Sequence, residues 1–132
     1  METSTVPLTT NGFVVSDGWV SQTTYGFGPA DVPRIGTNTS GASISFPVTS
    51  ASAFYILGSV NLNHGLYDVT ITPSSAPGPQ QYNGSSHWVG LNTTLYLAMG
   101  LNRSQTYQVE LRNDSPGLWF DISDIVLFDA PP

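Results

Sequence analysis

Alternation of apolar and polar residues with a period of two runs through most of this chain of 132 residues. Side chains alternate between the two faces of a β-strand, so this pattern predicts strands with one buried face. The run 53–60 (AFYILGSV) is apolar on both faces, which predicts a central strand that is covered on both sides. No stretch has a convincing helical period. The expected strands are 12–20, 42–48, 53–60, 66–72, 95–101, 106–112 and 118–128.

Turn residues separate these runs, with Gly and Pro clustered at 26–36, 73–79 and 115–117. Short strands at this spacing predict one all-β domain over 1–132, an antiparallel β-sandwich of the jelly-roll type, with 1–11 as a flexible N-terminal segment. One core is expected to contain Ile44, Phe46, Phe54, Ile56, Val69, Ile71, Leu97, Val109, Leu111, Phe120 and Ile122.

A carboxylate interrupts the last strand. Phe120, Ile122, Val126 and Phe128 share one phase of the alternation, and Asp124 falls inside that phase. Three explanations stay open: a β-bulge at residues 123–124, a buried carboxylate held by hydrogen bonds, or a calcium ligand.

The composition excludes several classes of protein. The chain has no cysteine and no lysine, which removes cysteine nucleophiles, thiolate metal sites and Schiff-base chemistry. Charged residues make up 9% of the chain and the net charge is −6, so no basic surface is available for nucleic acid. No apolar run is long enough to insert into a membrane. The first 20 residues lack the features of a signal peptide, so a secreted domain would have lost its signal.

Five Asn-X-Ser/Thr acceptors occur in the chain, where composition alone would give roughly 2. This excess predicts an extracellular or secreted glycoprotein with its acceptors in exposed loops. The alternative is that Ser- and Thr-rich loops generate acceptors by composition. Asn113 is the weakest acceptor because Pro116 follows its Ser115. The predicted glycosylation sites are Asn38, Asn83, Asn92 and Asn102.

Three short motifs point to a family. They are Gly41-Ala42-Ser43, Asn63-His64-Gly65-Leu66-Tyr67 and Asp121-Ile122-Ser123-Asp124. Their order resembles the galactose-binding-domain-like jelly rolls, of the carbohydrate-binding-module type, found in secreted and membrane-anchored proteins of basidiomycete fungi. The resemblance covers about two thirds of the chain. It implies an extracellular, lectin-like module of the kind that forms one part of a larger surface protein.

The chain departs from that pattern in two places. The loop 73–79 contains three prolines where the family has a tight Asp-Gly turn. Calcium-binding relatives carry acids near the first strand, and here only Asp17 and Asp31 are available. We therefore expect no cofactor. Structural calcium stays open as an alternative, with Asp121 and Asp124 as its weak candidate ligands.

The jelly-roll order would gather loops 21–40, 59–65, 85–93 and 113–118 at one end of the sandwich. An aromatic ring for the apolar face of a sugar, with amides and imidazoles for its hydroxyls, is what glycan binding requires. The predicted ligand-binding residues are Trp88, as the stacking platform, with Tyr25, Asn63, His64, His87, Arg112 and Trp119.

Four of these residues also have a structural explanation. Trp88 and Trp119 would then pack in the core or at its rim, and His64 would hydrogen-bond the backbone of a turn. Arg112 would form a surface ion pair with Glu110 or Asp114.

The leading hypothesis is a non-catalytic module that binds a neutral cell-wall polysaccharide or oligosaccharide. No nucleophile with a base and an orienting partner is evident in the sequence, so an enzyme is not expected. The alternative is a structural or adhesion ectodomain that acts through protein–protein contact.

Overall fold

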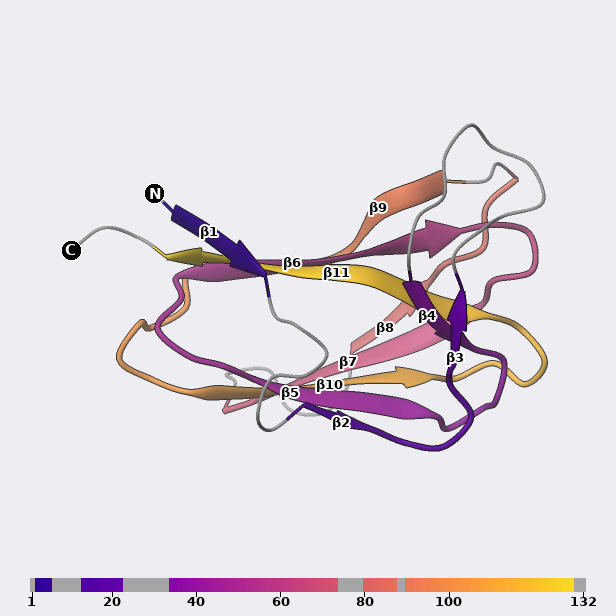
Figure 1. Ribbon diagram of the computed structural model, residues 1–132, viewed down its shortest axis with the longest axis horizontal. Coiled ribbons are helices and arrows are strands. Elements are labelled where there is room, and N and C mark those ends of the chain that lie inside the picture. The colour runs from indigo at the N-terminus through magenta and orange to yellow at the C-terminus, as the bar shows by residue number, and fades with distance from the viewer. Residues whose placement is uncertain (1, 6–12, 23–33, 74–79, 88–89, 130–132) are drawn as a thin grey trace.

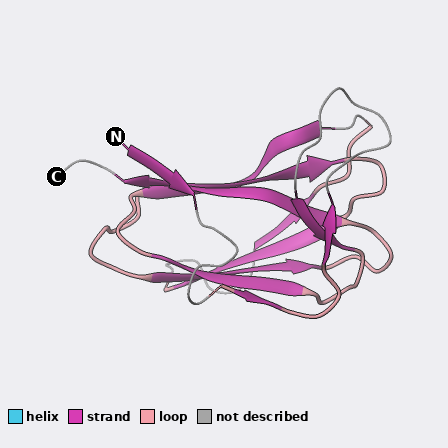
Figure 2. Ribbon diagram, in the orientation of Figure 1, coloured by secondary structure: helices cyan, strands magenta, loops and turns pink. Residues whose placement is uncertain are grey.

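The computed structural model describes residues 2–5, 13–22, 34–73, 80–87 and 90–129. All regular structure in these ranges is β-strand, and the strands form two antiparallel sheets that face each other (Figure 1, Figure 2). The prediction of an all-β sandwich is confirmed. None of the described segments forms a helix long and apolar enough to cross a membrane.

Each sheet draws its strands from distant parts of the sequence. The first has six strands, in the order β3 (Val20–Gln22), β4 (Arg34–Thr37), β11 (Phe120–Asp129), β6 (Ala53–Val60) and β9 (Gly90–Ala98), with β1 (Glu2–Thr5) also paired to β11. The second has five, in the order β2 (Val14–Val15), β5 (Ser43–Val48), β10 (Tyr107–Asn113), β7 (Leu66–Thr72) and β8 (Gln80–Asn83).

The N-terminal region differs from its prediction. The single strand expected over 12–20 is two short strands on different sheets, since Val14 pairs with Ser45 and Val20 pairs with Gly36. Gly18 lies between them with φ +97°, a backbone conformation that favours glycine, and the chain changes sheet there. Residues 2–5, placed by the sequence in a flexible segment, form β1 against β11.

The core lies between the two sheets. Nine of the eleven predicted core residues are buried in it; Ile71 is partly buried against it, and Leu97 is 52% exposed. Phe46 and Phe54 meet edge to face at its centre, with ring centroids 6.4 Å apart. The prediction for Leu97 was wrong.

A bulge in β9 explains the error. Ile56 pairs with Tyr96 whereas Leu57 pairs with Thr94, so Leu95 is an extra residue on its strand. Leu95 is buried, and the Tyr96 ring packs on Phe54 at 5.9 Å. The extra residue changes the alternation, which leaves Leu97 on the outer face.

A second bulge lies in β11, as the first of the three explanations for Asp124 predicted. Ile122 pairs with Gly58 and Asp124 pairs with Leu57, so Ser123 is the extra residue. Asp124 is only half-buried, and its carboxylate accepts from the Ile125 N–H at 2.9 Å. The fully buried carboxylate of this strand is that of Asp121.

Tyr67 supplies a pH-dependent contribution to stability. Its ring stacks on Phe120 at 4.9 Å, and its hydroxyl donates to the Leu95 carbonyl at 2.5 Å. Burial, and secondarily Tyr82, raises the pKa of Tyr67 to about 12.

We expect the stabilisation from the protonated phenol to be complete below pH ~10, the pKa of tyrosine in unfolded chains, and to be lost as the pH rises through about 12. Urea denaturation of wild type and Tyr67→Phe at several pH values between 8 and 12 measures this effect. The wild type should lose more of its free energy of unfolding above pH ~10 than the variant does. Parallel pH profiles for the two proteins would contradict the assignment.

Candidate functional site

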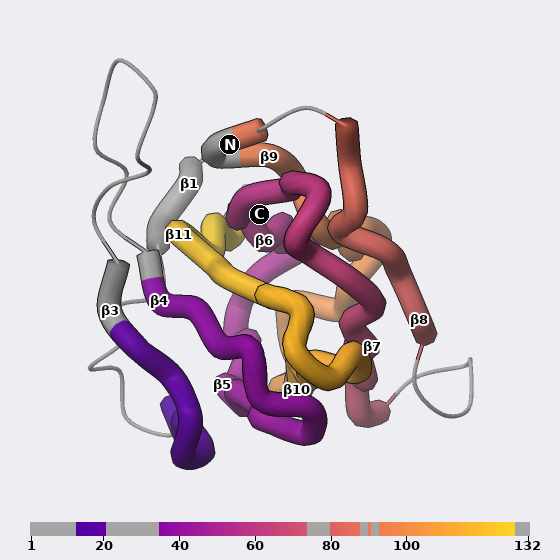
Figure 3. Tube along the Cα trace, turned by 90° about the vertical axis from the view of Figure 1, so that its right-hand side faces the viewer, coloured from indigo at the N-terminus to yellow at the C-terminus, as the bar shows by residue number. Residues whose placement is uncertain are grey.

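Three described loops meet at one end of the sandwich, which we call the loop end: residues 61–65, 84–87 and 114–119. Figure 3 views the molecule from this end. The Asn61 N–H donates to the Gly84 carbonyl at 3.3 Å, and the Trp119 N–H donates to the Asn63 carbonyl at 2.8 Å. The gathering of loops 59–65 and 113–118 beside residues 85–87 agrees with the sequence prediction; residues 23–33 and 88–89 lie outside the described residues.

Main-chain and hydroxyl hydrogen bonds join the loops of the loop end to one another and to the start of β7. The Gly84 N–H donates to the Gly65 carbonyl at 2.8 Å, and the Leu66 N–H donates to the Ser115 hydroxyl at 2.8 Å. Gly65 is required there, because a Cβ on it would lie 2.6 Å from the Ser115 Oγ. These contacts give the loops defined positions, as a binding surface needs.

The predicted ligand-binding residues divide into three groups. Asn63 and His87 are exposed at the loop end and Trp119 is half-buried there, so these three are available to a ligand. His64 is only 3% exposed, so its side chain does not reach a ligand. Trp88 and Tyr25 lie outside the described residues.

Arg112 lies next to the loop end, one residue before the end of β10. It lies on β10 with Cα partners Ser43 and Asp68, so its side chain belongs to the outer face of the second sheet. Its Nη2 donates to Glu110 at 3.0 Å. This is the surface ion pair with Glu110 that was the alternative explanation for Arg112.

His64 instead joins a buried cluster with Ser59 and Asp121, which the sequence did not predict. Nε2 of His64 lies 2.7 Å from Oδ2 of Asp121, and the Ser59 hydroxyl lies 2.5 and 2.6 Å from the two carboxylate oxygens. The Ser59 N–H donates to Oδ1 of Asp121 at 2.9 Å. All three residues are at most 3% exposed. The cluster ties the 61–65 loop to β6 and β11.

On the other side of the His64 ring, Nδ1 lies 2.9 Å from Oδ1 of Asn63. An amide can serve either protonation state of the imidazole, because its oxygen accepts from a protonated Nδ1 and its nitrogen, after rotation, donates to a bare one. The buried cluster thus continues to the exposed Asn63 and positions that side chain at the loop end.

Although Ser, His and Asp are the residues of a hydrolase triad, their arrangement here is different. A triad places its carboxylate and its serine on opposite ring nitrogens. Here both approach Nε2, since Ser59 Oγ lies 3.3 Å from it. The Ser59 hydroxyl is also much closer to the carboxylate than to the imidazole. This geometry favours a structural network over an activated nucleophile.

The glycosylation acceptors separate by exposure. Asn38, Asn83 and Asn102 are exposed, as glycosylation requires, and the Asn92 side chain lies outside the description. Asn113 is fully buried, and its Nδ2 donates to the carbonyls of Thr39 and Leu118 at 3.3 and 3.1 Å. In the folded chain this amide therefore hydrogen-bonds the backbone and is not accessible for glycosylation.

No group of three or more metal-ligating side chains lies together in the described part of the chain. Of the two weak candidate calcium ligands, Asp121 is hydrogen-bonded to Ser59 and His64, and Asp124 accepts a hydrogen bond from the N–H of the next residue, Ile125. The expectation of no cofactor stays a prediction.

Comparison with known proteins gives the fold. No family model and no curated protein matches the sequence. The structure is similar to a two-domain esterase active on acetylated mannans, with 11% identity and a TM-score of 0.64, over 98% of this chain and 37% of that one. It is also similar to a family two carbohydrate esterase from Cellvibrio japonicus, with 16% identity and a TM-score of 0.58, over 98% of this chain and 34% of that one.

A third similar structure is an isolated module. It is the CBM36-1 domain of a multidomain xylanase from the hindgut metagenome of Trinervitermes trinervoides, with 16% identity and a TM-score of 0.51, over 99% of this chain and 100% of that one. The chain has the jelly-roll fold of carbohydrate-binding modules. It spans about a third of the length of the two esterases. At these identities the likeness establishes the architecture and does not identify a ligand.

Proposed function

We propose that the chain is a non-catalytic carbohydrate-binding module that recognises a neutral polysaccharide or oligosaccharide in an extracellular setting. The observation that carries the proposal is the loop end of a carbohydrate-binding-module fold, where Asn63, His87 and Trp119 are available on hydrogen-bonded loops. Amide and imidazole groups bind sugar hydroxyls, and an indole binds the apolar face of a pyranose.

Two further observations support the absence of catalysis. The Ser59–His64–Asp121 cluster is buried and lacks the geometry of a triad. The isolated CBM36-1 module is covered in full by this chain, whereas the two esterases are covered over only about a third of their length. An extracellular setting is supported by the exposure of Asn38, Asn83 and Asn102.

A glycan array with fungal and plant cell-wall polysaccharides tests the proposal, followed by calorimetric titration of a bound oligosaccharide. The dissociation constant should be about 10 μM to 1 mM, because a shallow site contacts few ligand atoms. Affinity should change little with salt, since the recognition groups named here do not depend on charge pairing. Trp88→Ala should lower affinity at least about tenfold if Trp88 is the stacking platform, and Trp119→Ala should do so if Trp119 is.

Gln108→Ala is the matched control, because Gln108 is exposed on the outer face of β10 at the end of that strand far from the loop end; its affinity should equal that of wild type. An array without any bound glycan would contradict the proposed function. Capture of a defined protein partner by the same surface would favour the adhesion alternative.

A further inference from the structure

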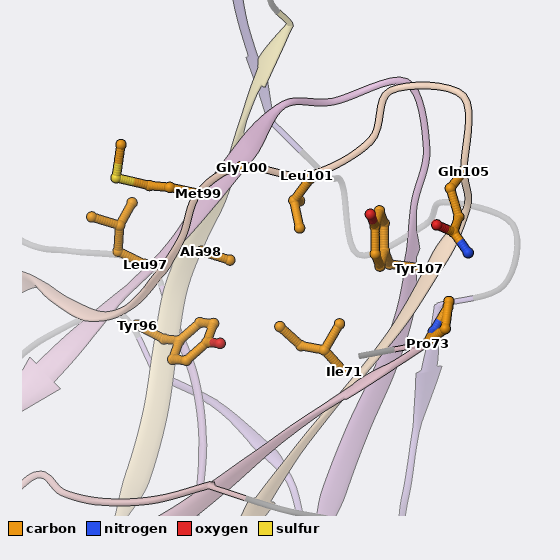
Figure 4. A pocket seen from close by; sticks show the side chains of 10 residues that line it. All are labelled: Ile71, Pro73, Tyr96, Leu97, Ala98, Met99, Gly100, Leu101, Gln105 and Tyr107. Carbon is orange, nitrogen blue, oxygen red and sulfur yellow. The ribbon is translucent and has the colours of Figure 1, made fainter. Parts of the chain in front are cut away.

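A groove of about 580 Å³ lies at the opposite end of the sandwich from the loop end. It opens where β9 ends and β10 begins, beside the end of β7 (Figure 4). Its walls include Ile71, Tyr96, Leu101, Gln105 and Tyr107. Figure 4 shows the side chains of Ile71, Leu101 and Tyr107 turned toward the same space, whereas Leu97 and Met99 extend away from it.

Backbone contacts hold the groove in shape. Gly100 has φ +71°, which favours glycine, and the chain turns there. The Leu101 N–H donates to the Ser52 carbonyl at 2.9 Å, and the Gln105 N–H donates to the Asn102 carbonyl at 3.0 Å. The Tyr107 hydroxyl accepts from the Asn102 N–H at 2.9 Å. The wall formed by residues 100–107 is thus anchored before any ligand binds.

The chemistry of the walls selects a neutral ligand with both apolar and hydroxyl surfaces. Ile71 and Leu101 supply an apolar lining, and the Gln105 amide is exposed at the rim. None of the described residues that line the groove carries a formal charge. Burial, and secondarily Tyr82, raises the pKa of Tyr96, so its phenol keeps its proton at neutral pH and can donate to a hydroxyl.

We propose that this groove is a second sugar-binding site, which takes one or two units of a neutral oligosaccharide between the Tyr96 ring, the Leu101 side chain and the Gln105 amide. The inference rests on the proposed function, since it assigns the same class of ligand to another surface. The volume is within the roughly 300–1,000 Å³ of small-molecule sites and leaves room for a short oligosaccharide only. Two sites at opposite ends would let one module contact a polysaccharide chain twice, or two chains at once.

The test is a two-dimensional NMR titration of ¹⁵N-labelled protein with cellotetraose and, separately, mannopentaose. Protein from bacteria avoids a sugar on Asn102, which lies next to the groove. We expect shift changes at residues 98–107 that saturate independently of those at the loop end. Gln105→Ala and Tyr96→Phe should each weaken only the groove transition, by roughly 3- to 10-fold, because each removes one hydrogen-bonding group.

Matched controls carry the same substitutions elsewhere. Gln108→Ala removes an exposed amide from the outer face of β10, and Tyr55→Phe removes a hydroxyl from a ring that packs on Phe128 outside the groove. Neither should change either transition. Shifts at the loop end alone would overturn the inference and leave the proposed function standing. Shifts at the groove alone would support the inference and contradict the proposed location. The absence of shifts with both sugars would overturn both.

Discussion

Asp121→Ala should lower the free energy of unfolding by about 3–5 kcal/mol, a large part of what a domain of this size possesses. The Asp121 carboxylate accepts from the Ser59 N–H, the Ser59 hydroxyl and Nε2 of His64. All these donors are buried, so without the carboxylate they lose an acceptor that water cannot replace without opening the structure. Urea denaturation followed by tryptophan fluorescence measures the loss.

Two further variants distinguish the loss of the buried cluster from the general effect of removing a carboxylate from this strand. Asp124→Ala removes a half-exposed carboxylate from the same strand and should cost less than about 1 kcal/mol. Asp121→Asn keeps the shape and one acceptor, and should fall between the two because the His64 imidazole can present a bare Nε2 to the new amide. An Asp121→Ala variant as stable as Asp124→Ala would contradict the structural role of the cluster.

The same cluster connects stability to the proposed glycan site. His64 contacts Asp121 on one side and Asn63 on the other, so the loop that presents Asn63 is held to the core by a buried hydrogen-bond chain. Asp121→Asn should therefore weaken glycan binding at the loop end even where the fold persists. The weakening should be a loss of preorganisation, since Asp121 itself is buried and touches no ligand.

The sequence predicted the strands whose alternation is continuous. The bounds of β6 and β7 coincide with the predicted 53–60 and 66–72. The residues of β6 are apolar on both faces and those of β7 alternate with a period of two, so both strands stand out in the sequence. It failed at Leu97, where the bulge in β9 shifts the alternation by one residue. A bulge has no residue signature of its own at Leu95; it is set by the partner strand.

The sequence predicted less of the site than of the fold. It assigned His64 to the ligand because the jelly-roll order brings loop 59–65 to the end where the other candidate residues gather. The partners that bury the imidazole, Ser59 and Asp121, come from β6 and β11, and Ser59 lies near the end of an apolar strand without any distinguishing feature. A ligand contact of Arg112 stays a prediction, because the end of a strand in sequence does not specify which face its side chain occupies, and in the structure Arg112 pairs with Glu110 on the outer face.

Gly58→Ala is the second variant for which we expect a large effect, about 3 kcal/mol or more of the free energy of unfolding. A Cβ at this position would lie 2.2 Å from the carbonyl oxygen of Asp121 and 2.5 Å from Cδ1 of Leu95. Gly58 follows the positions on β6 that face both bulges and pairs with Ile122 on β11 and Thr93 on β9, so this inner strand has little freedom to move away. The clash is with backbone, which a change of rotamer does not relieve.

Gly84→Ala is the matched control, because its Cβ would meet the nearest atoms, the Gly65 carbonyl oxygen and the His64 Cβ, at 3.5 Å, an ordinary contact. It should cost less than about 1 kcal/mol. Relief of the Gly58→Ala clash requires β11 to shift at Asp121, which disturbs the hydrogen bonds to Ser59 and His64 as well. The double variant Gly58→Ala/Asp121→Ala should therefore lose less stability than the two single losses combined. Additive losses in the denaturation experiment would show that the bulged strand and the buried cluster are independent.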